Sequence, residues 1–262
     1  MLLLLVLPGL ALVWNSLAPD GRPSLAVYAR ILAGGGYRRA ILTSVLLATV
    51  SAGLGTAVGG PVALALHRLV GDRLRATLVA LATVATNYGG LPLVFGFVLL
   101  LGSQGALTLL LGQLARRPVS VELVSFWGLV LVYQYFLVPL CVLTFLPALA
   151  LLRPELAEAA AVHGARPGRF WRHVGGPLLL PPLGASFLVC FAHALGSFTT
   201  PWALIGGGSS LTLIPLQIGF LYGEAGFDLE AADALAVTVI ALVAAALAVY
   251  DRAMRRVARW SA

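Results

Sequence analysis

Long apolar runs separated by short polar segments extend along the whole chain. A helix needs about 20 apolar residues to cross the hydrocarbon core of a bilayer. Runs of this kind predict six membrane-spanning helices, at residues 1–17, 40–67, 76–102, 125–152, 183–206 and 231–250. The predicted fold class is therefore all-α, a polytopic membrane protein with six transmembrane helices and one long polar loop at residues 153–182.

The same pattern divides the chain into three parts. Residues 1–39 hold the first helix and an external segment, residues 40–250 form the main transmembrane domain, and residues 251–262 form a basic tail. The first apolar run lacks a positively charged start and a small-residue cleavage site, which favours a membrane anchor over a signal peptide.

Composition supports the membrane assignment, because 60% of the 262 residues are hydrophobic and only 10% are charged. A soluble domain carries about 25% charged residues. The formal net charge is +7, and all 17 basic residues behind it are arginines because the sequence contains no lysine. These arginines lie between the apolar runs and form no aromatic-basic stripe, so no nucleic-acid partner is expected. Cys141 and Cys190 lie inside apolar runs and predict neither a disulfide framework nor a metal site.

Arginines are concentrated on one side of the predicted bilayer. That side holds Arg68, Arg73, Arg75, Arg153, Arg166, Arg169, Arg172, Arg252, Arg255, Arg256 and Arg259. The opposite side holds Arg22, Arg30, Arg38, Arg39, Arg116 and Arg117. By the positive-inside rule the first side is cytoplasmic. Both termini and the loop of residues 153–182 are therefore predicted to face the cytoplasm.

The first half of this loop predicts a short helix over residues 154–163. Glu155 and Glu158 lie in its first turns, where the helix dipole favours carboxylates. Gly164 is suited to end the helix because glycine adopts the left-handed conformation at low cost. We expect a sharp bend there.

A second short helix is predicted to begin at Pro167, since proline is favoured in the first turn. It carries an apolar stripe formed by Phe170, Trp171 and Val174. The sequence Gly175-Gly176-Pro177 is expected to end it before the fifth span. An amphipathic helix of this kind either lies in a groove on a partner protein or rests on lipid headgroups.

The loop resembles the EAA loop of ATP-binding-cassette (ABC) importer permeases. The matching residues are Glu158, Ala159, Ala160, Gly164, Val174 and Pro177. Gly176 replaces the usual leucine, and His163 stands where the family often has aspartate. The resemblance implies that the loop docks into a cleft of a cytoplasmic ATPase subunit and transmits its movement. By this resemblance Phe170 and Trp171 belong to the same coupling element.

Further segments resemble the spermidine/putrescine-type permeases and their relatives. They are TNYGGLPLVFGFVLLLGSQGALTLLL at residues 86–111, VYQYFLVPLCVLTFLPAL at 132–149, and HALGSFTTPWALIGG at 193–207. Relatives that import ferric iron, thiamine, sulfate or phosphonates share much of this pattern. The resemblance implies a second permease subunit, cytoplasmic ATP-binding subunits and an extracytoplasmic substrate-binding protein as partners within the lipid bilayer. It places ATP and Mg on the partner ATPase, and no cofactor in this chain.

Uncharged polar side chains interrupt the predicted spans at three places. The candidates are Asn87, Tyr88, Tyr133, Gln134, Tyr135, His193, Ser197 and Thr200. Polar groups at membrane depth face either a water-filled path or neighbouring helices, where a hydrogen bond contributes about 0.6–2 kcal/mol. We predict that Asn87, Gln134 and His193 together line a translocation path. Gly89, Gly90 and Pro92 are expected to kink or unwind the third span beside them.

No aspartate or glutamate lies well inside any predicted span, which disfavours a proton-coupled carrier. The same absence leaves a polyamine substrate without carboxylate partners in the spans of this chain, although a dication is best held by carboxylates or an aromatic cage. Small residues at 51–53, 55, 59 and 60 allow close helix packing. They serve either packing within this chain or the surface against a second permease.

The sequence contains no phosphate-binding Gly-x-x-x-x-Gly-Lys motif, no Ser-His-Asp set and no paired carboxylates within the spans. No catalytic residue is therefore predicted, and the chain is not expected to be an enzyme. The predicted function is a permease subunit of an ABC importer in a bacterial inner membrane, with a polyamine as substrate. The alternatives are the same importer for another small solute (ferric iron, thiamine, sulfate or phosphonate), or a non-transporting membrane scaffold.

Overall fold

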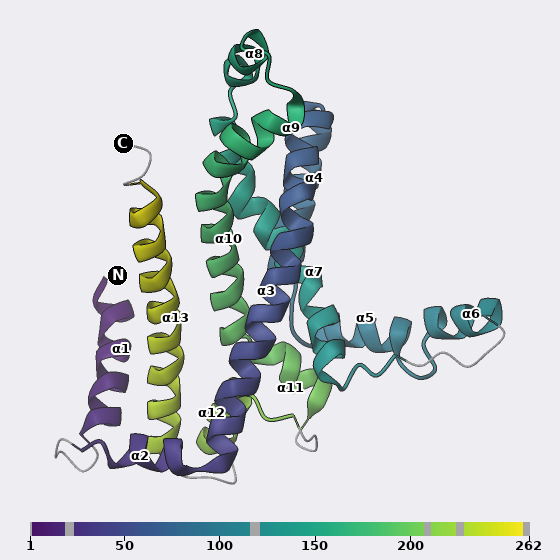
Figure 1. The fold of residues 1–262 in the computed structure, drawn as a ribbon. Helices are drawn as coiled ribbons and strands as arrows, with labels where there is room; N and C mark the ends of the chain where they lie inside the picture. Colours follow the sequence, from purple (N-terminus) through teal and green to yellow (C-terminus); the bar gives the residue numbers. More distant parts are fainter. Residues whose placement is uncertain (1, 19–23, 116–120, 207–210, 224–227, 259–262) are drawn as a thin grey trace.

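The computed structural model describes residues 2–18, 24–115, 121–206, 211–223 and 228–258. These residues form helices and connecting turns, and no strand occurs among them (Figure 1). Five helical segments are long and apolar enough to cross a membrane, and Leu7–Leu17 is a shorter apolar helix. The predicted all-α class is confirmed. The predicted orientation also used Arg22, Arg116, Arg117 and Arg259, which lie outside the described residues.

The helices follow in the order shown in Figure 1. They are α1 (Leu2–Leu17), α2 (Ala26–Ala33), α3 (Gly35–Leu69), α4 (Asp72–Asn87), α5 (Leu91–Leu101), α6 (Ala106–Ala115), α7 (Phe126–Phe145), η2 (Leu146–Leu151), α8 (Pro154–Val162), α9 (Pro167–Phe170), η3 (Trp171–Gly175), α10 (Gly176–Gly196), α11 (Thr199–Ile205), α12 (Ile214–Tyr222) and α13 (Leu229–Ala258). Of these, α3, α10 and α13 run lengthwise through the molecule, and α2 lies across the end opposite α8.

The core forms where α3 packs against α7 and α10, and small residues on α3 make this close approach possible. A Cβ atom added at Gly59 would lie 2.7 Å from the Cβ of Cys141, and one at Gly55 would lie 3.0 Å from the Cβ of Leu137. One added at Gly60 would lie 3.1 Å from Leu183. Gly55, Gly59 and Gly60 therefore serve packing within this chain, whereas Gly53 has open space beside it.

The predicted third span, residues 76–102, is broken rather than kinked. Its helix ends at Asn87 and restarts at Leu91, and Gly90 between them has a φ of 78°, a conformation that favours glycine. After the break α5 and α6 extend sideways from the body (Figure 1). We call α5 and α6 together the arm. The expected unwinding beside Gly89, Gly90 and Pro92 is confirmed, and the left-handed residue Gly90 redirects the chain.

The predicted stop at Gly175-Gly176-Pro177 was also wrong. The chain stays helical from Pro167 to Gly196, and a π-helical turn, η3, joins α9 to α10. In this turn the Gly176 N–H donates to the Trp171 carbonyl, five residues earlier. A Cβ at Gly176 would lie 2.6 Å from that carbonyl oxygen, so glycine permits the wide turn. The Gly-Gly-Pro sequence thus widens the helix instead of ending it.

Two further boundaries differ from the prediction. The last part of the predicted fifth span, residues 183–206, forms the separate helix α11 after α10 ends at Gly196. At the carboxyl end, α13 continues to Ala258, where a tail was expected from residue 251. Short helices α2, α6 and α12 were not predicted, because each is shorter than a membrane span.

Candidate coupling loop and translocation cavity

The helix that carries the Glu-Ala-Ala sequence projects from the end of the molecule. Figure 1 shows α8 standing beyond the other helices. None of its residues is buried; Glu158 and Ala159 are exposed, and Val162 is 86% exposed. A short helix with no buried side has little packing of its own to hold it, so it is open to contact by another molecule.

The end of α8 is fixed by backbone geometry, as the sequence predicted. Gly164 has a φ of 73°. The Ala165 N–H donates to the Ala160 carbonyl and the Gly164 N–H to the Ala161 carbonyl, both at 2.9 Å. These two bonds form a Schellman motif, which satisfies the last carbonyls of the helix. The shape of the bend therefore depends on Gly164 and on the backbone of the Glu-Ala-Ala segment.

The second half of the loop packs against the chain itself. Pro167 begins α9 in its first turn, as predicted. Phe170 is 8% exposed, and Val174 is half-buried. The Arg68 guanidinium lies 4.9 Å from the centre of the Trp171 ring. The apolar stripe therefore attaches the second half of the loop to the end of α3. The first half, α8, stays exposed, and so does Pro177 further along the chain.

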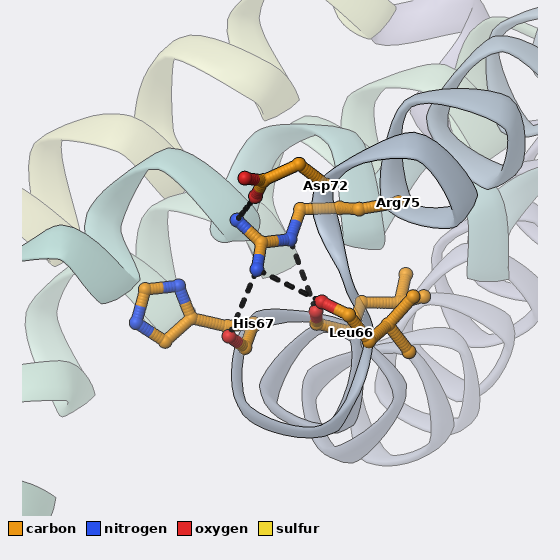
Figure 2. Close-up of polar contacts among 5 residues, drawn as sticks. Leu66, His67, Asp72 and Arg75 are labelled. Atoms are coloured by element: carbon orange, nitrogen blue, oxygen red, sulfur yellow. Dashed lines mark hydrogen bonds and ion pairs between the residues drawn. The ribbon is translucent and has the colours of Figure 1, made fainter.

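The turn between α3 and α4, next to Arg68, is held by Arg75. Figure 2 shows the Arg75 guanidinium reaching back to the last turn of α3. It donates to the carbonyls of Leu66, His67 and Val70 at 3.2, 3.3 and 3.0 Å, and lies 3.5 Å from the Asp72 carboxylate. A cation at the carboxyl end of a helix satisfies free carbonyls and the helix dipole. Sequence reasoning used Arg75 only for orientation and missed this contact.

A cavity lies where two helix breaks meet, the α4–α5 break and the α10–α11 break. A Cβ at Gly90 would lie 2.9 Å from the Cγ2 of Thr199, so the two breaks touch. The cavity has a volume of about 450 Å³. It is lined by Thr86, Asn87, Gly89, Gly90, Phe136, His193, Gly196, Ser197, Phe198, Thr199 and Thr200. We call it the path cavity.

The path cavity brings together four of the predicted path residues: Asn87, His193, Ser197 and Thr200. The Asn87 amide donates to the Thr83 carbonyl at 2.8 Å, and the His193 ring lies 5.2 Å from the ring of Phe136. Hydroxyl, amide and imidazole groups line it, and no carboxylate is among its lining residues. Such a lining is able to exchange hydrogen bonds with a hydrated solute but supplies no negative charge.

The other predicted path residues lie elsewhere. The Gln134 amide donates to the carbonyls of Ser51 and Val130 at 3.2 and 2.9 Å, so it links α7 to α3. Tyr133 is 1% exposed, contacts Ser197 and is not among the lining residues of the path cavity. Tyr135 packs edge-on against Phe97, and Tyr88 is exposed at the helix break. The structure therefore does not bring Gln134 together with Asn87 and His193.

Several lining residues were missed by sequence reasoning, among them Thr86 and Phe136. Thr86 precedes Asn87, and its hydroxyl donates to the Ala82 carbonyl at 2.9 Å. Phe136 is apolar, and nothing in its spacing marks it. Among the residues that the structure describes, no group of three His, Cys, Asp or Glu side chains could hold a metal ion. Asp233, near the start of α13, accepts a hydrogen bond from Tyr222 and does not line the cavity.

Comparison with known proteins identifies relatives over most of the chain. The family described as "Binding-protein-dependent transport system inner membrane component" matches residues 55–261. The molybdenum transport system permease protein ModB of Mycobacterium bovis is 33% identical over 208 residues, which cover 78% of this chain and 75% of that protein. The thiamine transport system permease protein ThiP of Escherichia coli is 31% identical over 64% of this chain and 31% of its own length.

Solved structures agree in fold. A bacterial alginate ABC transporter, in complex with an alginate pentasaccharide-bound periplasmic protein, has a chain that aligns with a TM-score of 0.70. The alignment covers 98% of this chain and 94% of that chain at 17% identity. The chain belongs to the binding-protein-dependent transport system inner membrane components, the multi-pass permease subunits of ABC importers.

Proposed function

We propose that this chain is one of two permease subunits that together pass a small solute inward, and that a cytoplasmic ATPase drives it through α8. The observation that carries this proposal is that α8 buries none of its residues, while Phe170 in the second half of the loop is buried against the permease. A helix that buries none of its residues in its own chain is suited to a cleft on a partner. Glu158, Ala159 and Gly164 would be the parts that meet the ATPase.

The helix that follows the bend connects the loop to the path cavity. Residues from Pro167 to Gly196 form one continuous helical run, which begins beside α8 and ends with His193 and Gly196 in the cavity wall. A helix that shifts as a rigid body between two placements transmits a displacement from one end to the other. Closure of the ATPase on α8 would therefore shift the cavity wall at the other end.

A second permease is proposed to cover the arm. Between α5 and α6 the chain makes a turn at residues 102–105, and the arm exposes Phe95, Leu99 and Leu114 at 62, 72 and 82%. Backbone turns at membrane depth must be buried in protein, because lipid satisfies no backbone hydrogen bonds. Figure 1 shows none of the other described helices beside the outer part of the arm.

Orientation is proposed as the arginine distribution predicts. Arg68, Arg75 and Arg153 lie around the base of α8, and cytoplasmic segments are enriched in arginine. Figure 1 shows α1 beginning and α13 ending toward the α8 end. With α8 reaching a cytoplasmic ATPase, both termini would face the cytoplasm.

The proposed substrate is a small oxyanion such as molybdate. The mycobacterial relative is named for molybdenum transport, and the path cavity has hydrogen-bonding groups without a carboxylate. A polyamine dication would lack a counter-charge in this cavity. The polyamine therefore stands as the second candidate, carried by the sequence resemblance of residues 86–111 and 193–207.

Affinity purification of the tagged chain from its native membranes, followed by mass spectrometry, tests this proposal. We expect an ATP-binding subunit, a permease subunit and an extracytoplasmic binding protein to remain attached. Titration calorimetry of that binding protein with molybdate, sulfate and spermidine then tests the substrate. Tight binding of spermidine alone would replace the oxyanion by the polyamine. Recovery of the chain without any ATPase, under conditions that preserve membrane complexes, would favour the scaffold.

A further inference from the structure

A small basic pocket lies at the base of the coupling loop, where α3 ends and α8 begins. It has a volume of about 210 Å³, and His67, Arg68, Arg153, Pro154 and Phe170 are among its lining residues. No carboxylate lines it. Within the described part of the chain, neither Arg68 nor Arg153 forms an ion pair. Two arginines and a histidine thus line one small space, and none of its lining residues supplies a counter-charge.

We propose that this basic pocket binds the phosphate group of an anionic membrane phospholipid. Guanidinium groups present planar N–H donors that match phosphate oxygens, and these charge-assisted hydrogen bonds are stronger than neutral ones. Arg68 is already held in place, because its guanidinium lies over the Trp171 ring at 4.9 Å. The edges of a guanidinium stacked in this way remain free to donate to a phosphate.

The position of the basic pocket favours a lipid over a free anion. It lies at the ends of two membrane-length segments, Gly35–Leu69 and Phe126–Leu151, where lipid headgroups would lie. The last leucine of each segment is exposed, Leu69 at 83% and Leu151 at 50%. A phospholipid would place its phosphate on the arginines and its acyl chains along these leucines. Basic pockets at the cytoplasmic ends of transmembrane helices bind lipid headgroups in this manner.

Occupation of the pocket would affect the coupling loop directly. Arg153 is the residue before α8, and Arg68 contacts Trp171 after the bend. A phosphate bound to both arginines would tie the two halves of the loop to the end of α3. Anionic lipid would therefore stiffen the connection between the ATPase and the permease.

Lipid retention by the intact importer tests the proposal. The complex, purified with its native partners, is placed in phosphatidylcholine vesicles with or without phosphatidylglycerol, then extracted and examined by native mass spectrometry. Wild type is expected to retain phosphatidylglycerol in preference to phosphatidylcholine. Arg153→Gln is expected to retain at least about tenfold less, since a lost charge-assisted hydrogen bond corresponds to about 1.5–3 kcal/mol. Arg73→Gln is the matched control, because Arg73 is exposed on α4 and does not line the pocket.

Three results would overturn the proposal. The first is equal retention of phosphatidylglycerol by Arg153→Gln and Arg73→Gln, with Arg68→Gln also unchanged. The second is wild-type retention without preference between the two lipids, or complete displacement of phosphatidylglycerol by added inorganic phosphate, which would indicate a free-anion site. The third concerns Arg153→Gln: it retains phosphatidylglycerol as wild type does, but loses the ATPase subunit in vesicles of phosphatidylcholine alone. The pocket would then bind a side chain of the ATPase rather than a lipid.

Discussion

The guanidinium of Arg68, at the end of α3, lies 4.9 Å above the ring of Trp171, in the segment that follows the bend of the coupling loop. These two residues are separated by about a hundred positions in the chain. A cation over an indole ring contributes about 0.5–1 kcal/mol at an exposed site. The contact joins the loop to α3, the helix that packs against α7 and α10 in the core.

Loss of this contact should weaken coupling without disrupting insertion. In Trp171→Leu the cation–π contact is lost while an apolar side chain remains. We expect solute uptake to fall about two- to fivefold, as a loss of 0.5–1 kcal/mol implies. Uptake by vesicles containing the complete importer measures this. Trp127→Leu is the control, because Trp127 is exposed on α7 and makes a ring contact only with Phe126 among the described residues. Equal uptake by both variants would contradict the assignment.

At position 164, in the bend after α8, a residue that disfavours the left-handed conformation should impair transport. Gly164→Ala is expected to destabilise the bend by about 1–2 kcal/mol, although no atom lies within 4 Å of the added Cβ. Gly164→Pro should abolish uptake, because proline fixes φ near −65° and cannot donate to the Ala161 carbonyl.

Gly168→Ala provides the matched control for both Gly164 variants. Gly168 also has open space around its Cβ position, but it lies in α9 with an ordinary φ. We expect it to transport at the wild-type rate. Comparable losses in Gly164→Ala and Gly168→Ala, measured by uptake at matched expression, would show that the left-handed bend is not needed.

Reversal of the Glu158 charge should uncouple the permease from its proposed ATPase partner. Glu158 is exposed on α8 and has no described hydrogen-bond partner in its own chain, so Glu158→Lys should leave the membrane helices intact. We expect uptake to fall by at least about tenfold while the protein still inserts, because one lost charged contact corresponds to about 1.5–3 kcal/mol. Glu155→Lys, one turn earlier on α8, is the charge-matched comparison. Normal uptake in Glu158→Lys would contradict the coupling role.

The packing of α3 on α7 should depend on Gly59 and not on Gly53. The Cβ of Gly59→Ala would lie 2.7 Å from the Cβ of Cys141 and 3.0 Å from the Val138 carbonyl, so the helices must move apart. Overpacking of this kind costs about 1–3 kcal/mol. Gly53→Ala adds a Cβ into open space on the same helix and should be neutral or slightly stabilising. Thermal unfolding in detergent compares the two, and equal midpoints would exclude a tight contact at Gly59.

Local features of the coupling loop were predictable because they depend on neighbouring residues. Gly164 adopts the left-handed conformation, and Pro167 begins a helix, for reasons contained within a few positions of the chain. Gly175-Gly176-Pro177 is the exception. Its composition predicts a stop, but the π turn between Trp171 and Gly176 carries the helix onward.

The sequence did not predict which of the polar side chains in the spans line the path cavity. Asn87, Gln134 and His193 look alike as polar interruptions of apolar runs, and periodicity does not distinguish their surroundings. The structure places Gln134 in a hydrogen bond to the Ser51 carbonyl, away from the path cavity that Asn87 and His193 line. Which way a polar side chain faces depends on the rotation of one helix against another.

The sequence alone determined the membrane class, the helical fold and the short helix with its bend at Gly164, because hydrophobic length and capping residues are properties of contiguous segments. Only the tertiary structure decided that Arg68 meets Trp171, that Gly59 meets Cys141, and that the breaks at Gly90 and Thr199 enclose one cavity. Each of these pairs joins residues far apart in the chain. Their meeting depends on the packing of whole helices, which no local pattern encodes.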